Sequence, residues 1–263
     1  MTSYVVCATP RSGSTLLCKT LAETGVAGDP EEFFEAVPTT GVPRRPLDYL
    51  SGLDDPEALA LVERAPPHPA PPYSDLRAVG SYPEHLERAR EWGTTPNGVF
   101  GAKIMWAHLE DLARQCDSDD LRAVVDTVFD RPRLVWVRRA DTVRQAVSLW
   151  RAMQTQSWRA ENEADAGEPQ YSFAAIHHLV ELLSAHDAAW GRFFASGGAD
   201  VLTVAYDDLA SDLAGVLART LDHIGVAPPD GALEALPRLR RQADGRSGAW
   251  ADAYARDAAL ATR

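Results

Sequence analysis

Residues 3–24 constrain the fold of this chain more than any other stretch. They begin with a short apolar run at 4–8, which has the pattern of a buried β-strand, and end with leucines at helical spacing. A polar turn, residues 9–15, joins the two. In α/β proteins such a turn directs backbone N–H groups and the positive end of a helix dipole at one spot, where a phosphate-like anion binds. The stretch therefore predicts an α/β protein with an anion-binding loop.

The loop departs from the nucleoside-triphosphate pattern G-x-x-x-x-G-K-[ST] at two positions. Gly13 and Thr15 stand at the required places, but Ala8 replaces the first glycine and Ser14 replaces the lysine that reaches the β- and γ-phosphates. A cation is present inside the loop instead, at Arg11. This pattern favours an anion cradle over a site for a nucleoside triphosphate. The alternative interpretation is that these residues bind no ligand and form an ordinary strand–turn–helix with a serine-rich helix start.

Length and composition favour one domain. The 263 residues, 45% of them hydrophobic, suffice for a single sizeable core. We expect one domain over residues 1–263, with an insertion at about 38–80 that is rich in Pro, Gly and Ala. This insertion is either a lid over an acceptor site or a passive loop.

Composition also limits the compartment and the partners. The three cysteines are odd in number and lack C-x-x-C spacing, which fits a reduced, cytoplasmic compartment. The chain has no run of about 18 apolar residues and no secretory-signal pattern, so we expect no membrane span. The net charge of −12 argues against a nucleic-acid surface, so a polyanion must bind at a local basic site.

Four apolar runs, at 4–8, 99–103, 134–138 and 201–205, alternate with helical patterns. This alternation predicts an α/β fold with three layers, similar to P-loop proteins, in which helices flank a central, mainly parallel sheet. Ligands of such sheets bind at the carboxyl ends of the strands, and the loop at 9–15 follows the first strand.

The loop resembles the 5′-phosphosulfate loop of sulfotransferases, in which a Lys or Arg precedes a Ser-Gly-Ser/Thr-Thr turn. Further words, such as Glu-Phe-Phe and Arg-Gln-Ala-Asp, are similar to the bacterial trehalose 2-sulfotransferase family. Five stretches of the chain match this family in order: 9–15, 32–34, 97–106, 138–151 and 241–250. The resemblance implies sulfonyl transfer from the co-substrate 3′-phosphoadenosine 5′-phosphosulfate (PAPS) to a hydroxyl of a carbohydrate-type acceptor such as trehalose. It also implies 3′-phosphoadenosine 5′-phosphate (PAP) as product and no metal, because fixed cations hold the leaving group.

The resemblance assigns the donor's 5′-phosphosulfate to the first loop. Arg11 would neutralise charge on the departing phosphate oxygen, and the residues after it would supply N–H and hydroxyl donors. These donors are Ser12, Gly13, Ser14 and Thr15.

Two further stretches would bind the nucleotide. Arg139, at a strand end, and Ser148, in the following helix, look like the pair that holds the 3′-phosphate, with Arg138 as the alternative arginine. Arg241 and Gln242 lie where the family has a loop that closes over the nucleotide. If they bind no nucleotide, Arg138 and Arg139 are arginines of a solvated turn, and Arg241 is part of a basic surface strip.

Glu32 matches the glutamate of the Glu-Phe-Phe word, which the family uses as general base. Local sequence offers another interpretation, because Asp29 is a good N-cap and would place Glu32 at the third helical position of a capping box. Glu31 is the alternative base if the register differs by one.

Four residues are candidates for contact with the acceptor: Phe33, Lys103, His108 and Trp158. Lys103 stands in an apolar strand and is expected to reach the surface at the strand end, near the loop anion. His108 is either a polar group of the site or merely exposed. Trp158 either stacks on a sugar or belongs to the core.

Two other classes compete with a sulfotransferase. A P-loop kinase or NTPase would need a lysine at position 14 and an acidic Mg²⁺ ligand after a strand. A non-catalytic nucleotide-binding module would not need Glu32. The expected partner is a small sugar or glycoconjugate acceptor, and a homodimer is an assembly that the sequence leaves open.

Overall fold

The chain forms two compact units in the computed structural model, which describes residues 2–41, 45–65, 80–158, 168–197, 200–231 and 245–261. The first, here called the sheet unit, comprises Met1–Pro43, Pro71–Arg139 and His186–Arg240. The second, the helical unit, comprises Arg44–Ala70, Ala140–Ala185 and Arg241–Arg263. The prediction of one domain with an insertion stays a prediction.

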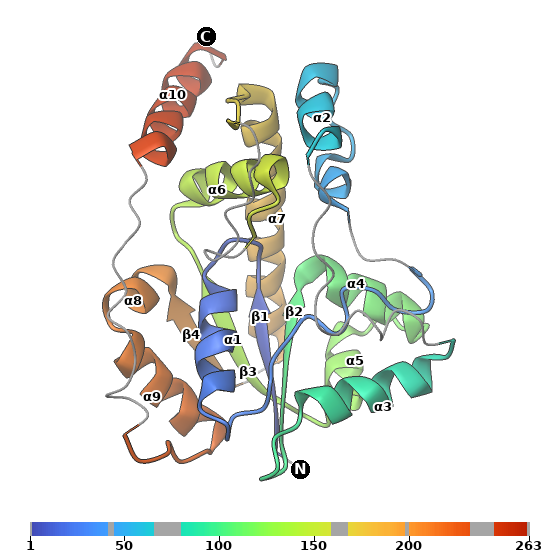
Figure 1. Ribbon diagram of the computed structural model, residues 1–263. Coiled ribbons are helices and arrows are strands. Elements are labelled where there is room, and N and C mark those ends of the chain that lie inside the picture. Colours follow the sequence, from blue (N-terminus) through green and yellow to red (C-terminus); the bar gives the residue numbers. More distant parts are fainter. Residues whose placement is uncertain are drawn as a thin grey trace. The chain divides into compact units, whose positions relative to one another are not determined.

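The sheet unit is built on a parallel sheet with strand order β2-β1-β3-β4 (Figure 1). All three strand pairs are parallel. The strands coincide with the apolar runs of the sequence: β1 Thr2–Ala8, β2 Val99–Met105, β3 Arg133–Arg138 and β4 Val201–Ala205. The predicted α/β class is therefore confirmed.

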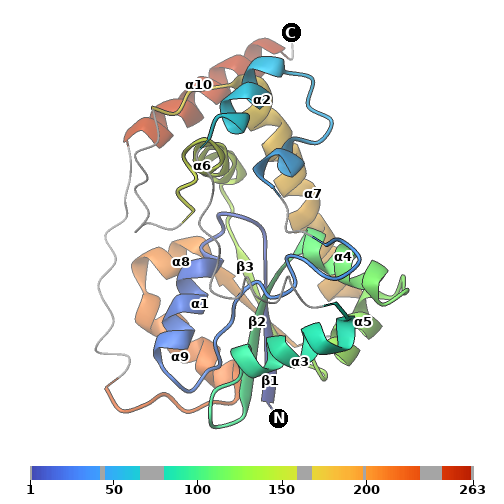
Figure 2. The ribbon, with the colours of Figure 1, turned by 45° about the vertical axis from the view of Figure 1, so that its right-hand side comes forward.

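Alternate residues of β1 face two different cores, as the two-residue period of a strand requires. Val5 and Cys7 belong to one core, whereas Tyr4, Val6 and Ala8 belong to the other. Helices cover both faces, with α1, α8 and α9 on one side and α3, α4 and α5 on the other (Figures 1 and 2). Their bounds are α1 Ser14–Glu23, α3 Tyr82–Gly93, α4 Trp106–Gln115, α5 Leu121–Val128, α8 Tyr206–Ser211 and α9 Leu213–Ile224. The predicted three layers are present.

The strand order sets the place of the site. β1 lies between β2 and β3, so the chain leaves β1 toward one edge of the sheet and later leaves β3 toward the other. Such a change of direction opens a crevice at the carboxyl ends of the two adjacent strands. Ala8, the last residue of β1, pairs with Val137 of β3. The anion loop and the arginines after β3 therefore leave the sheet side by side.

The helical unit has its own apolar core. It contains η1 Pro46–Leu50, α2 Pro56–Glu63, α6 Thr142–Thr155, α10 Gly245–Ala261 and residues 173–185 of α7 Phe173–Gly197. Trp150 is fully buried in this core, and its indole N–H donates to the carbonyl of Gln170 at 2.8 Å. Helix α2 lies within the stretch that the sequence predicts to be an insertion. Residues 42–44 and 66–79 of the proposed insertion lie outside the described residues.

One predicted helix is wrong in its extent. The sequence predicts a single helix from Tyr206 to near Gly225, but the structure has α8 and α9 with a break at Asp212. Asp212 has φ −143°, which is not helical, and its carboxylate accepts a hydrogen bond from the Gly215 N–H at 2.9 Å. The side chain thus caps α9 at the cost of continuity with α8.

Within the described ranges, no helix combines the length and the apolar character needed to cross a bilayer.

Candidate active site

The loop after β1 is shaped to receive an anion. Arg11 and Gly13 have positive φ values of 63° and 94°, and Gly13 is the N-cap of α1. No acidic side chain stands in the first turn of α1 to neutralise its N-terminal N–H groups. The Ser12 hydroxyl is fully buried and has no hydrogen-bond partner among the described residues. Because buried polar groups are normally bonded, this hydroxyl fits a ligand oxygen.

Tyr206, the first residue after β4, supports this loop. A Cβ added at Gly13 would lie 3.0 Å from Tyr206 Cδ2 and 3.2 Å from Leu209 Cδ1. A larger residue at position 13 would therefore force these side chains to shift, and it would have to adopt a φ of 94°, which L residues rarely do.

Gly13→Ala is expected to destabilise the protein and to weaken PAP binding. A non-glycine residue held at an unfavourable backbone conformation costs about 1–3 kcal/mol, and the new methyl group would push the loop away from Tyr206. Gly25→Ala is a matched control, because Gly25 also has positive φ, 69°, but nothing lies within 4 Å of its added Cβ. Melting curves and PAP titration compare the variants. Unchanged PAP affinity in Gly13→Ala would contradict this role of the loop.

Glu32 is placed by pairing with the sheet edge. Glu31 forms an isolated parallel bridge with Ala102, and the Lys103 N–H donates to the Glu31 carbonyl at 3.0 Å. No helix begins at Asp29, so the capping-box interpretation of Glu32 is wrong. The backbone here is held by β2 instead, and this pairing sets the Glu32 side chain next to Lys103.

A buried lysine joins this carboxylate to the anion loop. Lys103 Nζ lies 2.8 Å from Glu32 Oε1 and 3.1 Å from Thr15 Oγ1. Lys103 is 2% exposed, so the expectation that it reaches the surface is wrong. Its ammonium is buried because Glu32 and Thr15 satisfy it there. The Glu32 side chain is 23% exposed and can meet a ligand.

The charge on Lys103 is secured by its neighbours. Burial alone lowers the pKa of its ammonium. Attraction by the Glu32 carboxylate outweighs this and raises the pKa above its ordinary value, with smaller contributions from Cys18, from the hydrogen bond that Lys103 donates to Glu32 and from Glu31. Lys103 is therefore a fixed cation beside the loop.

His108 also lies near the carboxylate. It is buried rather than exposed, and its Nδ1 is 3.9 Å from Glu32 Oε2. Its role as a polar group of the site stays a prediction. Phe33 is instead 2% exposed and stacks near Phe100, with 6.5 Å between ring centroids. Its ring thus supports the Glu32 segment from within the core.

The two arginines at the end of β3, Arg138 and Arg139, have different partners. Arg139 Nη1 donates to the carbonyl of Arg11 at 3.3 Å, and its guanidinium carbon lies 4.3 Å from the centroid of the Tyr206 ring. Arg138 instead makes two hydrogen bonds to Asp187 of α7, one of them 3.1 Å long. This charge pair raises the pKa of Arg138, first through the hydrogen bond to Asp187. Arg139 therefore contacts the anion loop, whereas the guanidinium of Arg138 is held by Asp187.

The remaining predicted residues belong to the helical unit or lie outside the described residues. Ser148 is half-buried on α6 of the helical unit. Trp158 is half-buried against the core of the same unit, and its indole N–H donates to Gln156 Oε1 at 3.0 Å. Arg241 and Gln242 fall in residues 232–244, which the structure does not describe. The roles predicted for these four residues stay predictions.

Tyr206 is not among the site residues expected from the sequence, but it contacts the loop and Arg139. The available signal was its position: Tyr206 directly follows β4, at the carboxyl edge of the sheet where ligands bind.

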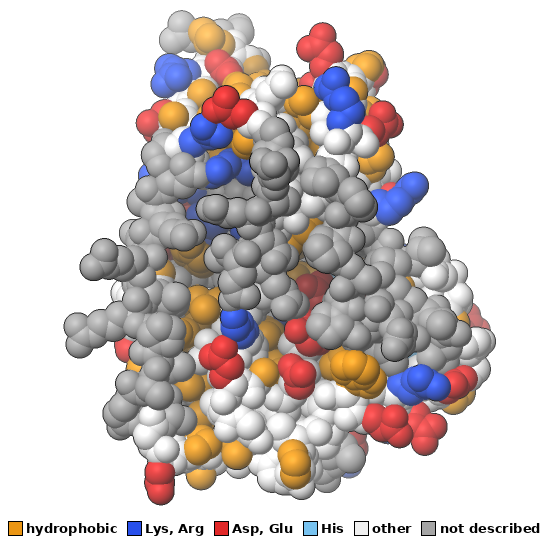
Figure 3. Space-filling model, in the orientation of Figure 1, with side chains coloured by type: hydrophobic (Ala, Val, Ile, Leu, Met, Phe, Trp, Pro, Cys, Tyr) orange, Lys and Arg blue, Asp and Glu red, His pale blue; other side chains and the backbone are white. Residues whose placement is uncertain are grey.

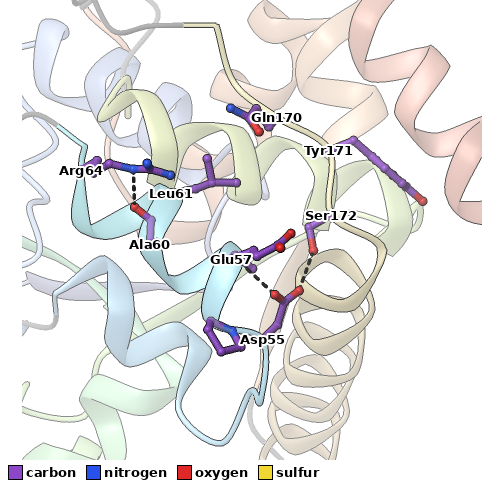
Figure 4. Close-up of a pocket in the computed structure, with 10 residues that line it drawn as sticks. Asp55, Glu57, Ala60, Leu61, Arg64, Gln170, Tyr171 and Ser172 are labelled. Carbon is purple, nitrogen blue, oxygen red and sulfur yellow. Dashed lines mark hydrogen bonds between the residues drawn. The ribbon is translucent and has the colours of Figure 1, made fainter.

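A separate cavity of about 550 Å³ lies in the helical unit, between α2 and residues 170–172 (Figure 4). Asp55 there accepts hydrogen bonds from the Ala58 N–H at 3.1 Å and from the Ser172 hydroxyl at 3.3 Å. Arg64 Nε donates to the Ala60 carbonyl at 2.9 Å. These groups stabilise the start and end of α2, so we assign the cavity no part in the chemistry.

The electrostatic character of the site is local. The described surface in Figure 3 carries acidic and basic side chains interspersed, and the whole chain has a net charge of −12. The cations that the structure describes at or beside the loop are Arg11, Lys103 and Arg139. Among the residues that the structure describes, no group of three or more His, Cys, Asp or Glu side chains could hold a metal ion.

The structure thus brings a polar loop and a carboxylate together at one edge of a parallel sheet. The chain belongs to the Stf0 sulphotransferase family, whose family model matches residues 3–257. It is 40% identical to a trehalose 2-sulfotransferase of Mycobacterium tuberculosis, over 97% of this chain and 95% of that protein. It is 36% identical to a trehalose 2-sulfotransferase of Mycolicibacterium smegmatis, over 98% and 96%. A solved sulfotransferase domain from the curacin biosynthetic pathway has a TM-score of 0.49 at 15% identity, covering 93% of this chain and 82% of that one.

These relatives confirm the predicted class. The protein is a sulfotransferase, and neither a kinase nor a non-catalytic binding module is favoured.

Proposed function

We propose that this protein transfers a sulfonyl group from PAPS to a hydroxyl of trehalose. Two relatives that match nearly the whole chain carry the name trehalose 2-sulfotransferase, which supports the acceptor. The observation that carries the chemistry is the contact between Glu32, Lys103 and Thr15, because it holds a carboxylate at the anion loop.

The residues of the loop fit the donor. The buried Ser12 hydroxyl and the N-terminal N–H groups of α1 suit the oxygens of a phosphosulfate, and Arg11 and Lys103 supply positive charge. Arg139 is the arginine that we assign to the 3′-phosphate, since Arg138 is bound to Asp187. Ser148, Arg241 and Gln242 complete the nucleotide site in this proposal, and Trp158 is proposed to contact the sugar.

Glu32 is the proposed general base. Its carboxylate takes the proton of the attacking hydroxyl as the new O–S bond forms and the bond from sulfur to the phosphate oxygen breaks. Arg11 and the loop N–H groups stabilise the negative charge that this phosphate oxygen gains. The electrostatic work is done by groups that are fixed before the reaction, so the residues described need not rearrange to supply it.

PAP is expected to raise the melting temperature in the presence of EDTA, because a ligand that binds only the folded state stabilises it by about 2.7 kcal/mol at 100 times its Kd. ATP with Mg²⁺ is expected to have a much smaller effect, since Ser14 replaces the lysine that would reach the γ-phosphate. Melting curves with each nucleotide, with and without EDTA, make the comparison. Stabilisation by Mg²⁺-ATP alone would contradict the proposed donor.

The acceptor is tested with labelled PAPS and a panel of sugars that includes trehalose, glucose and maltose. Label is expected in trehalose. Transfer of label to another sugar but not to trehalose would contradict the proposed acceptor. It would leave the proposed donor unchanged.

The compartment and the assembly are also proposals. Cys7 and Cys18 are buried free thiols, which supports a reducing cytoplasm. The homodimer stays a prediction.

A further inference from the structure

Lys103 contacts two residues that the proposed function assigns to different substrates. Its Nζ lies 2.8 Å from Oε1 of Glu32, the base for the acceptor, and 3.1 Å from Oγ1 of Thr15, in the donor loop. The three residues come from β2, from the segment after α1 and from the first turn of α1. A single buried ammonium thus joins both halves of the site.

The direction of these hydrogen bonds follows from their chemistry. A lysine ammonium has three donors and no acceptor, so the Thr15 hydroxyl must accept from Lys103. The hydroxyl proton of Thr15 is then directed away from Lys103 and can be donated to an anion in the loop. A chain of hydrogen bonds results, from the Glu32 carboxylate through Lys103 and Thr15 to the anion site.

Binding of the donor brings a second negative charge close to Glu32. Two anions that share a site repel one another, and such repulsion raises the pKa of a carboxyl group. A protonated Glu32 could not accept the hydroxyl proton, so the site must prevent this protonation when the donor binds.

We infer that Lys103 is a positioning residue that keeps Glu32 ionised when the donor occupies the loop. This inference rests on the proposed function. Lys103 neutralises Glu32 and, through Thr15, faces the donor anion, so that donor binding proceeds without proton uptake by the base.

Other titratable groups surround this pair. Glu31 and Asp29 lie on the same segment as Glu32, and His108 approaches from α4. Cys18 faces Lys103 from α1, and burial raises the pKa of its thiol to about 12, so it stays neutral at ordinary pH. A variant that removes Glu32 is therefore needed to attribute any proton to this carboxylate.

The test is the number of protons taken up when PAP binds, measured by calorimetry in buffers of different ionisation enthalpy between about pH 5.5 and 7.5, around the second pKa of a phosphate. Wild type and Glu32→Gln are expected to give the same number, since Glu32 stays ionised in wild type. Lys103→Met is expected to take up as much as about one additional proton. Lys103→Met combined with Glu32→Gln is expected to lose this excess, and Lys103→Arg, which keeps the charge, is expected to match wild type.

Two results would overturn the inference. One is a Lys103→Met variant that binds PAP with the proton count of wild type, which would leave Lys103 a purely structural role. The other is proton uptake on PAP binding by wild type that disappears in Glu32→Gln, which would mean that Glu32 becomes protonated although Lys103 is present. This second result can be obtained even if Lys103→Met does not fold. Loss of sulfonyl transfer with the expected proton counts would contradict the proposed function alone. Failure of wild type to bind PAP would contradict both.

Discussion

Glu32→Gln is expected to lower turnover by about 10²–10⁴-fold, with PAP affinity close to that of wild type. The amide keeps the size of the side chain and an oxygen that can accept the hydrogen bond from Lys103, which lies 2.8 Å from the carboxylate. It loses the ability to take a proton. Steady-state kinetics of labelled sulfonyl transfer and calorimetry of PAP binding measure the two quantities separately.

The neighbouring Glu31→Gln is the matched control. The backbone of Glu31 makes the bridge to Ala102 and accepts the hydrogen bond from the Lys103 N–H, and both remain when the side chain changes. We expect this variant to keep most of its turnover. Normal turnover in Glu32→Gln, with the loss found in Glu31→Gln, would move the base by one residue. Normal turnover in both variants would remove the base from this segment.

Arg139→Ala is expected to weaken PAP binding by about 10- to 150-fold, because a hydrogen bond lost to a charged partner costs about 1.5–3 kcal/mol. Binding of adenosine 5′-phosphate, which lacks the 3′-phosphate, should change far less. Arg139 donates to the Arg11 carbonyl and lies over the face of Tyr206, which places it at the loop, whereas Arg138 forms an ion pair with Asp187.

Arg138→Ala provides the comparison for this prediction. Its guanidinium is held by Asp187 and lies 4.2 Å from the centroid of the Trp136 ring, so we expect a smaller loss of PAP affinity. A larger loss in Arg138→Ala would reassign the 3′-phosphate. Equal weakening of both ligands by Arg139→Ala would mean that this arginine acts only through the Arg11 carbonyl.

Features encoded locally were predictable from the sequence. The four strands appear as apolar runs, and the loop after the first of them has the letters of an anion cradle. The resemblance to sulfotransferases singled out Arg139 at a strand end, and the structure shows it donating to the Arg11 carbonyl of the loop. These inferences depend only on residues near one another in the chain and on general rules of parallel sheets.

Features that depend on distant pairing were not predictable. Asp29 and Pro30 are residue types typical of a helix N-terminus, but the backbone of Glu31 pairs with β2 and no helix forms there. Lys103 in an apolar strand suggested an exposed ammonium, because the sequence does not show that Glu32 and Thr15 meet it. The break at Asp212 required a choice between continuing a helix and capping a new one, and local propensity did not decide it.

We propose that Glu32, which is held next to the anion loop by Lys103, is the base of a PAPS-dependent sulfonyl transfer. This proposal is tested most directly by incubating sulfur-labelled PAPS and trehalose in EDTA with wild type and with Glu32→Gln. The account predicts labelled trehalose and stoichiometric PAP with wild type, and a rate lower by about 10²–10⁴-fold with the variant. Absence of labelled sugar with wild type, or equal rates with both proteins, would contradict it.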